Sequence, residues 1–136
     1  MTTTHSILIV DDEAHILQVL SLKLRNCGYT IYTAVDGEDA LHQAKQNPPD
    51  LVITDVQMPY MNGLEFAHEL SANSTTSHIP VVVLTARGHT LEISDTRIPN
   101  VKKVLSKPFS PRGIAELCVQ LLAEVQGRPS EIRDAA

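Results

Sequence analysis

The sequence alternates short apolar runs with stretches of helical periodicity, and this alternation limits the possible folds more than any other feature. Residues 7–10, 51–54 and 79–84 are almost wholly apolar, as expected of strands that are buried on both faces of a sheet. Residues 29–34 are rich in β-branched and aromatic side chains, and residues 102–106 form a weaker match. Five strands are therefore predicted.

Helix signals occupy the stretches between and after these runs, and four helices are predicted, at residues 14–27, 36–46, 62–70 and 111–125. Asn62 and Glu65 form a capping-box pattern, and Ser110 before Pro111 suits the start of a helix. Gly28 stands where a helix end favours a residue that tolerates positive φ.

This order of elements predicts an α/β fold: a doubly wound, five-stranded parallel sheet with helices on both faces. Residues 87–100 should hold one more helix, but Gly88, Ser94 and Pro99 lower its propensity, so a short or mobile helix is expected. One domain is predicted over residues 1–126. Residues 127–136 show no apolar pattern and are predicted to form a flexible tail.

The composition argues against a nucleic-acid or membrane partner. The 136 residues are 43% apolar, enough for one packed core, and the formal charge is −5, whereas nucleic-acid binding needs a basic face. Cys27 and Cys118 form no C-x-x-C pair and are predicted to be reduced packing residues. No apolar run approaches a membrane span and no signal peptide is evident, so a cytoplasmic location is expected.

Charged and polar residues stand at the carboxyl ends of four predicted strands. Asp11 and Asp12 follow the first strand, and Asp55 follows the third. Thr85 follows the fourth strand and Lys107 the fifth. Since the carboxyl ends of parallel strands meet at one edge of the sheet, these residues should converge. Close carboxylates repel each other unless a cation neutralises them, and oxygen ligands in an open site suit Mg²⁺, with Mn²⁺ as an alternative.

These charges predict phosphoryl transfer. Asp55 would attack a phosphoryl group in line, while the Lys107 ammonium and the Thr85 hydroxyl would hold phosphoryl oxygens. Each residue also has an ordinary explanation by itself, because aspartates cap helices or begin turns, lysines lie at surfaces and threonines end strands. Their joint position at the strand ends is what favours a site.

Four motifs carry a resemblance to a known family. They are Ile-Leu-Ile-Val-Asp-Asp-Glu at residues 7–13, Asp-Val-Gln-Met-Pro-Tyr-Met-Asn-Gly at 55–63, Leu-Thr-Ala at 84–86 and Lys-Pro-Phe at 107–109. In this order, each at a strand end, they resemble the receiver domain of two-component response regulators. The resemblance covers residues 6–125 and implies a flavodoxin-like receiver fold in a stand-alone, single-domain regulator.

The resemblance also implies how the site would work. Asp55 would accept a phosphoryl group from a sensor histidine kinase or a histidine phosphotransfer protein, and the changed surface would bind an unknown downstream protein. Thr85 would follow the phosphoryl group on activation. Lys107 would pair with Asp55 before phosphorylation and with the phosphoryl group after it.

A set of metal ligands follows from the same resemblance. Asp12 would bind Mg²⁺ directly, and Asp11 would act largely through water. Asp55 and the backbone carbonyl of Gln57 would complete the ligands that the protein supplies.

Four positions depart from the pattern of the family. Val104 stands where the family usually has Tyr, Phe or His, so the usual coupling of Thr85 to an aromatic ring cannot operate. Residues 100–101, Asn-Val, replace the usual Gly-Ala, and Tyr60 replaces a usual Gly. Phosphorylation of Asp55 is therefore easier to predict than its consequence.

Two other functions stay open. A receiver-like scaffold that no longer switches would account for Val104 and for the weak helix signal in residues 87–100. An aspartate-nucleophile phosphatase of the haloacid-dehalogenase type would need a second Asp two residues after Asp55, where Gln57 stands, and a cap insertion. The complete set of site residues favours a switching module, which is not expected to be a turnover enzyme.

Overall fold

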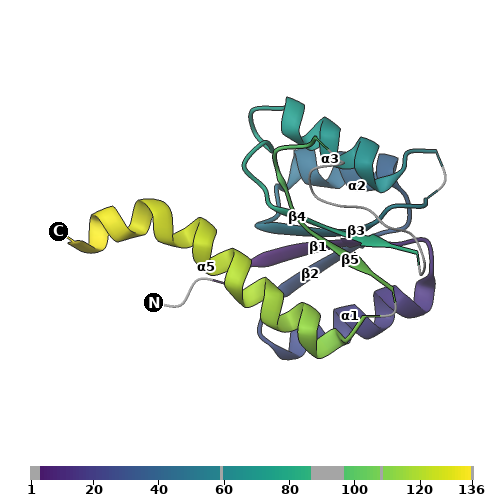
Figure 1. Ribbon diagram of the computed structural model, residues 1–136, viewed down its shortest axis with the longest axis horizontal. Helices are drawn as coiled ribbons and strands as arrows, with labels where there is room; N and C mark the ends of the chain where they lie inside the picture. The colour runs from purple at the N-terminus through teal and green to yellow at the C-terminus, as the bar shows by residue number, and fades with distance from the viewer. Residues whose placement is uncertain (1–3, 59, 87–96, 108, 136) are drawn as a thin grey trace.

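The computed structural model describes residues 4–58, 60–86, 97–107 and 109–135 and has a central sheet between two layers of helices (Figure 1). The elements in chain order are β1 (Ser6–Val10), α1 (Ala14–Asn26), β2 (Thr30–Ala34), α2 (Gly37–Gln46), β3 (Leu51–Asp55), α3 (Gly63–Ala72), β4 (Val81–Thr85), β5 (Val101–Ser106) and α5 (Pro111–Ala135).

The sheet is parallel throughout, and its strand order is β2-β1-β3-β4-β5. The chain moves outward from β1 to β2 and then returns to place β3 on the other side of β1. This reversal puts α1 and α5 on one face and α2 and α3 on the other, as Figure 1 shows. The predicted doubly wound fold is confirmed. Ligands bind such sheets at the point of reversal, here between β1 and β3.

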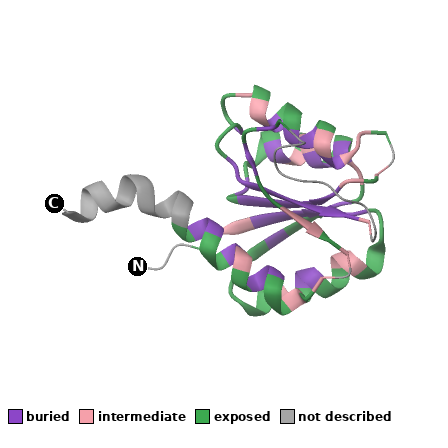
Figure 2. Cartoon of the chain, viewed as in Figure 1, coloured by how far each residue is buried: buried purple, intermediate pink, exposed green. Residues whose placement is uncertain are grey.

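The core has two apolar layers, one on each face of the sheet. Neighbouring side chains of a strand point to opposite faces, so Ile7 and Ile9 pack in the layer of α1 and α5, and Leu8 and Val10 pack in the layer of α2 and α3. The strands β3 and β4 are buried at every position, and Figure 2 shows them in the interior. Burial on both faces explains why their sequences are continuous apolar runs.

Hydrogen bonds at the helix ends agree with the sequence signals. The Glu65 backbone N–H donates to Oδ1 of Asn62 at 2.8 Å, and the Asn62 N–H donates to Oε1 of Glu65 at 2.9 Å, so the predicted capping box begins α3. At the start of α5 the Ser110 hydroxyl oxygen accepts from the Gly113 N–H at 3.1 Å. Gly28 after α1 has a φ of +99°, which favours glycine.

Most strand and helix ends lie within one or two residues of their predicted positions. The fourth strand begins at Val81 rather than at Ile79, because Pro80 has no N–H to donate to the ladder. Helix α5 continues through Ala135 and extends beyond the sheet in Figure 1, and the flexible tail predicted from Gly127 stays a prediction. A missing apolar pattern indicates that a helix has no packing face, not that its residues are non-helical. A domain limit at residue 126 stays a prediction.

The predicted helix within residues 87–100 falls mostly outside the described residues, which resume at Arg97. In the part of the chain that is described, no helix combines the length and the apolar character needed to cross a membrane.

Candidate functional site

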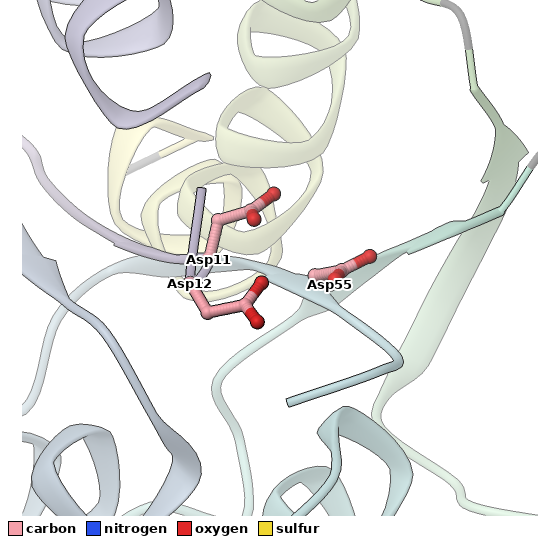
Figure 3. A group of neighbouring side chains, drawn as sticks. All are labelled: Asp11, Asp12 and Asp55. Carbon is pink, nitrogen blue, oxygen red and sulfur yellow. The ribbon is translucent and has the colours of Figure 1, made fainter. Parts of the chain in front are cut away.

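Strand ends bring the predicted site residues together at one edge of the sheet. Asp11 and Asp12 directly follow β1, and Asp55 is the last residue of β3, the strand beside β1. Each of the three aspartates contributes one carboxylate oxygen to a cluster, and these three oxygens all lie within 4.8 Å of one another. Figure 3 shows these side chains gathered where the two strands end. The convergence expected from the sequence is therefore present.

Burial makes the negative charge of this cluster unfavourable. Asp11 is 0% exposed and Asp55 is 5% exposed, whereas Asp12 is open to solvent. Desolvation, followed by repulsion from Asp11, raises the pKa of Asp55 to about 6 despite the attraction of Lys107. Desolvation also raises the pKa of Asp11, against a hydrogen bond from the backbone N–H of Glu13. A cation would stabilise such a cluster.

Lys107, the residue after β5, supplies positive charge to the site. Its Nζ lies 3.3 Å from Oδ1 of Asp55 and 3.3 Å from Oδ2 of Asp11. The shortest contact, 3.0 Å, is with Oε1 of Glu13. Burial acts to lower the pKa of Lys107, but the three carboxylates outweigh it and raise this pKa. The attraction of Lys107 does not restore the ordinary pKa of Asp55, because desolvation and the repulsion from Asp11 and Asp12 outweigh it.

Glu13 is the member of the site that the sequence reasoning missed. It is the N-cap of α1, yet its side chain makes no capping hydrogen bond. Its carboxylate instead accepts a hydrogen bond from Lys107, which lowers the pKa of Glu13. The available signal was its position directly after Asp11 and Asp12, because a third acidic residue at one strand end is more than a helix cap needs.

Thr85 is the last residue of β4. This strand lies between β3, which ends at Asp55, and β5, which is followed by Lys107. Thr85 is buried, and its hydroxyl lies 3.5 Å from the Leu105 carbonyl oxygen, at the long limit for a hydrogen bond. The Thr85 carbonyl accepts from the Lys107 backbone N–H at 2.9 Å, which joins the ends of β4 and β5. A hydroxyl held this weakly can change partner at little cost, as the predicted role of Thr85 requires.

The loop after β3 closes against Asp55 because Gly63 has no side chain. A Cβ at Gly63 would overlap the carbonyl oxygen of Asp55, and the Gly63 N–H donates to the Val56 carbonyl at 2.8 Å. Gln57 lies in this loop with an exposed side chain, and metal binding by its carbonyl stays a prediction. Tyr60, where the family usually has Gly, has a φ of +70° and is 84% exposed.

Two unusual positions lie in and just before β5. Val104 is partly buried against the layer of α2 and α3, so an aliphatic packing side chain occupies the position of the usual ring. Asn100 is 3% exposed, and among the described residues its side-chain nitrogen and oxygen have no hydrogen-bond partner. A buried amide without partners is unfavourable.

Comparisons with known proteins agree with this arrangement. A family model described as "Response regulator receiver domain" matches residues 7–118. The chain is 32% identical over 130 residues to the alkaline phosphatase synthesis transcriptional regulatory protein PhoP of Bacillus subtilis, covering 94% of this chain and 53% of PhoP. It is 37% identical over 112 residues to the probable transcriptional regulator ycf27 of Guillardia theta, covering 82% of this chain and 43% of ycf27. The chain thus spans about half the length of these curated relatives.

Solved structures of similar length share the fold. A putative response regulator from Chloroflexus aurantiacus matches with a TM-score of 0.79 and 33% identity, covering 89% of this chain and 99% of that one. The chemotaxis response regulator CheY4 of Vibrio cholerae matches with a TM-score of 0.80 and 31% identity, covering 88% and 99%. The family match runs from β1 into α5 and includes every residue of the cluster. The chain therefore belongs to the receiver domains of two-component response regulators.

Proposed function

We propose that Asp55 accepts a phosphoryl group and thereby switches the surface with which this receiver domain binds other proteins. The observation that carries the proposal is the buried Asp55 carboxylate, which has the Lys107 Nζ 3.3 Å away and the carboxylates of Asp11 and Asp12 beside it. The donor is a phosphohistidine on a sensor histidine kinase or on a histidine phosphotransfer protein.

Mg²⁺ is the cation that fits the aspartate cluster, with Mn²⁺ as an alternative. The donors are all oxygens, as hard divalent cations prefer, and the buried Asp11 and Asp55 leave negative charge to neutralise. The exposed Asp12 would bind the ion directly and Asp11 through water, together with Asp55 and the Gln57 carbonyl. When bound, the ion offsets the charge of the phosphoryl oxygens.

The transfer needs one nucleophile and several groups that stabilise charge. A carboxylate oxygen of Asp55 forms a bond to phosphorus while the bond from phosphorus to the donor imidazole nitrogen breaks. The imidazole keeps that electron pair and takes up a proton from water. Lys107 lies 3.3 Å from Asp55 before transfer and contacts a phosphoryl oxygen after it. The Thr85 hydroxyl leaves its long contact with the Leu105 carbonyl and donates a hydrogen bond to a second phosphoryl oxygen.

The consequence of transfer is a change in protein binding rather than turnover of a small substrate. Gln57 stands where an aspartate phosphatase of the haloacid-dehalogenase type needs its acid, so steady hydrolysis of phosphate esters is not expected. PhoP and ycf27 are named as transcriptional regulators, but a charge of −5 disfavours direct contact of this chain with nucleic acid. The downstream partner is therefore a protein. The cytoplasmic location stays a prediction.

A receiver-like scaffold that no longer switches is the second candidate. Val104 packs as an aliphatic side chain in the position of the usual ring, so the ring movement that accompanies Thr85 in other receivers has no counterpart. Under this alternative Asp55 still accepts phosphate, but the region around β5 does not respond.

Mass spectrometry after incubation with acetyl phosphate and Mg²⁺ tests the proposal. The wild type should gain one phosphoryl group that is stable in acid and labile in alkali, and Asp55→Asn should gain none. Asp39→Asn, an exposed change on α2, is the matched control and should behave as the wild type. A wild type without an adduct would refute the proposal. An adduct that leaves amide exchange over residues 97–107 unchanged would favour the scaffold.

A further inference from the structure

We propose that Glu13 competes with the phosphoryl group for Lys107 and thereby slows phosphorylation of Asp55, an inference that rests on the proposed function. The Oε1 of Glu13 lies 3.0 Å from Nζ of Lys107, closer than the 3.3 Å contact of Asp55. Glu13 acts through Lys107 and is therefore a positioning residue.

Backbone contacts hold Glu13 where it can reach Lys107. The Glu13 N–H donates to Oδ1 of Asp11 at 2.9 Å, and the Glu13 carbonyl accepts from the N–H groups of Ile16 and Leu17 in the first turn of α1. An N-cap side chain commonly accepts a hydrogen bond from that first turn, but the Glu13 side chain accepts none there. Its carboxylate is therefore available to Lys107.

Three carboxylates surround the ammonium of Lys107 at rest: Asp11 and Glu13 accept hydrogen bonds from Nζ, and Asp55 forms an ion pair with it. An ammonium has three N–H donors, and Asp11, Glu13 and Asp55 each place an oxygen within 3.3 Å of Nζ. A phosphoryl oxygen that approaches Lys107 therefore competes with these carboxylates. The side chains of Asp11 and Asp55 are 1% and 8% exposed, whereas that of Glu13 is 49% exposed. Glu13 regains water most easily and is the contact that yields.

Two effects of Glu13 act in the same direction. Its contact reduces the positive charge that Lys107 offers to an incoming phosphoryl group, and its own charge repels an anionic donor at the rim of the site. Partly exposed ion pairs are weak, so removing the Glu13 charge should accelerate phosphorylation by about two- to fivefold.

The rate of adduct formation with acetyl phosphate in saturating Mg²⁺ tests this inference. Glu13→Gln keeps the shape of the side chain and removes its charge, and it should react about two- to fivefold faster than the wild type. Glu69→Gln, an exposed change on α3 with the same loss of charge, is the matched control and should react at the wild-type rate. Affinity for beryllofluoride, an anionic phosphoryl analogue, should rise by a similar factor in Glu13→Gln, which a purely structural role would not produce.

The outcomes separate this inference from the proposed function. An adduct on Asp55 in the wild type, with Glu13→Gln reacting at the same rate or more slowly, would overturn the competition and leave phosphoryl acceptance intact. An equal acceleration in Glu69→Gln would also overturn it, because net charge rather than the contact with Lys107 would be the cause. Absence of any adduct in the wild type would overturn both.

Discussion

Gly63, the first residue of α3, packs directly against the carbonyl oxygen of Asp55, the last residue of β3. The same loop is tied to the sheet by hydrogen bonds, because the Gly63 N–H donates to Val56 and the Val56 N–H donates to the Leu84 carbonyl at 3.0 Å. The position of the proposed phosphoryl acceptor thus depends on a residue that carries no reactive group.

Gly63→Ala should destabilise the protein by roughly 1–3 kcal/mol, because the new Cβ must displace backbone atoms rather than a flexible side chain. It should also slow phosphorylation by shifting Asp55. Gly113→Ala, inside helix α5, is the control, since its Cβ would meet the Ser110 side chain at ordinary distances of 3.5 and 3.8 Å. Urea denaturation measures the free energy of unfolding of both variants. Equal stability of Gly63→Ala and the wild type would show that the loop withdraws without cost.

The raised pKa of Asp55 predicts a pH-dependent stability in metal-free protein. Its pKa rises from 3.8 in the unfolded chain to about 6 in the folded protein. The folded state therefore favours the protonated carboxyl. This contribution to stability is complete below about pH 3.8 and is lost as the pH rises through about 6. A shift of this size corresponds to roughly 3 kcal/mol at neutral pH.

Asp55→Asn isolates this effect, because the amide has the same shape and does not titrate. In EDTA the free energy of unfolding of the wild type should fall relative to that of Asp55→Asn between pH 4.5 and pH 7.5, by about 2 kcal/mol, because part of the contribution is already lost below pH 4.5. Excess Mg²⁺ should reduce the difference, since a cation stabilises the ionised carboxylate. Parallel curves for the two proteins in EDTA would contradict the raised pKa.

Removal of the Lys107 charge should make stability depend on Mg²⁺. Lys107→Met leaves the carboxylates of Asp11, Glu13 and Asp55 without their shared cation, and the loss in EDTA should be roughly 1–3 kcal/mol. Mg²⁺ should recover part of this loss, because it supplies positive charge to the same cluster. Lys103→Met, at an exposed position of β5, should show neither effect. Thermal or urea unfolding with and without Mg²⁺ gives the comparison.

Most of the fold could be predicted because its signals are local. The apolar runs mark β3 and β4, and the pair Asn62 and Glu65 marks the start of α3. The meeting of Asp55 and Lys107 also followed, since parallel strands bring their carboxyl ends to one edge. The last turns of α5 could not be predicted in this way, because apolar periodicity reports packing and not helix formation by itself.

The finer details of the site depend on side-chain geometry and tertiary packing. Glu13 reaches Lys107 because of its side-chain rotamer and its position at the start of α1. Residue spacing alone predicts neither of these. The burial of Asn100 depends on how the turn before β5 meets the sheet. Asparagine is common in exposed turns, so its type alone predicts the opposite exposure.

The side chain of Asn100, which has no hydrogen-bond partner in the part of the chain that the structure describes, gives the last prediction. Asn100→Leu replaces a buried amide by an apolar side chain with the same branching, while the Asn100 backbone carbonyl keeps its 2.8 Å hydrogen bond from the Val81 N–H. The free energy of unfolding should rise by about 1–2 kcal/mol, because the desolvation penalty of the amide is removed.

Asn73→Leu provides the contrast, since Oδ1 of Asn73 accepts hydrogen bonds from the backbone N–H and the hydroxyl of Thr75 at 3.1 and 2.8 Å. Loss of these contacts should lower the free energy of unfolding by about 1 kcal/mol in urea denaturation. Opposite signs for the two variants would show that the partners of an amide, rather than its chemical type, decide its effect on stability. If Asn100→Leu were less stable than the wild type, the amide of Asn100 would have hydrogen-bond partners in solution. The conclusion that burial of this amide is unfavourable would then be wrong.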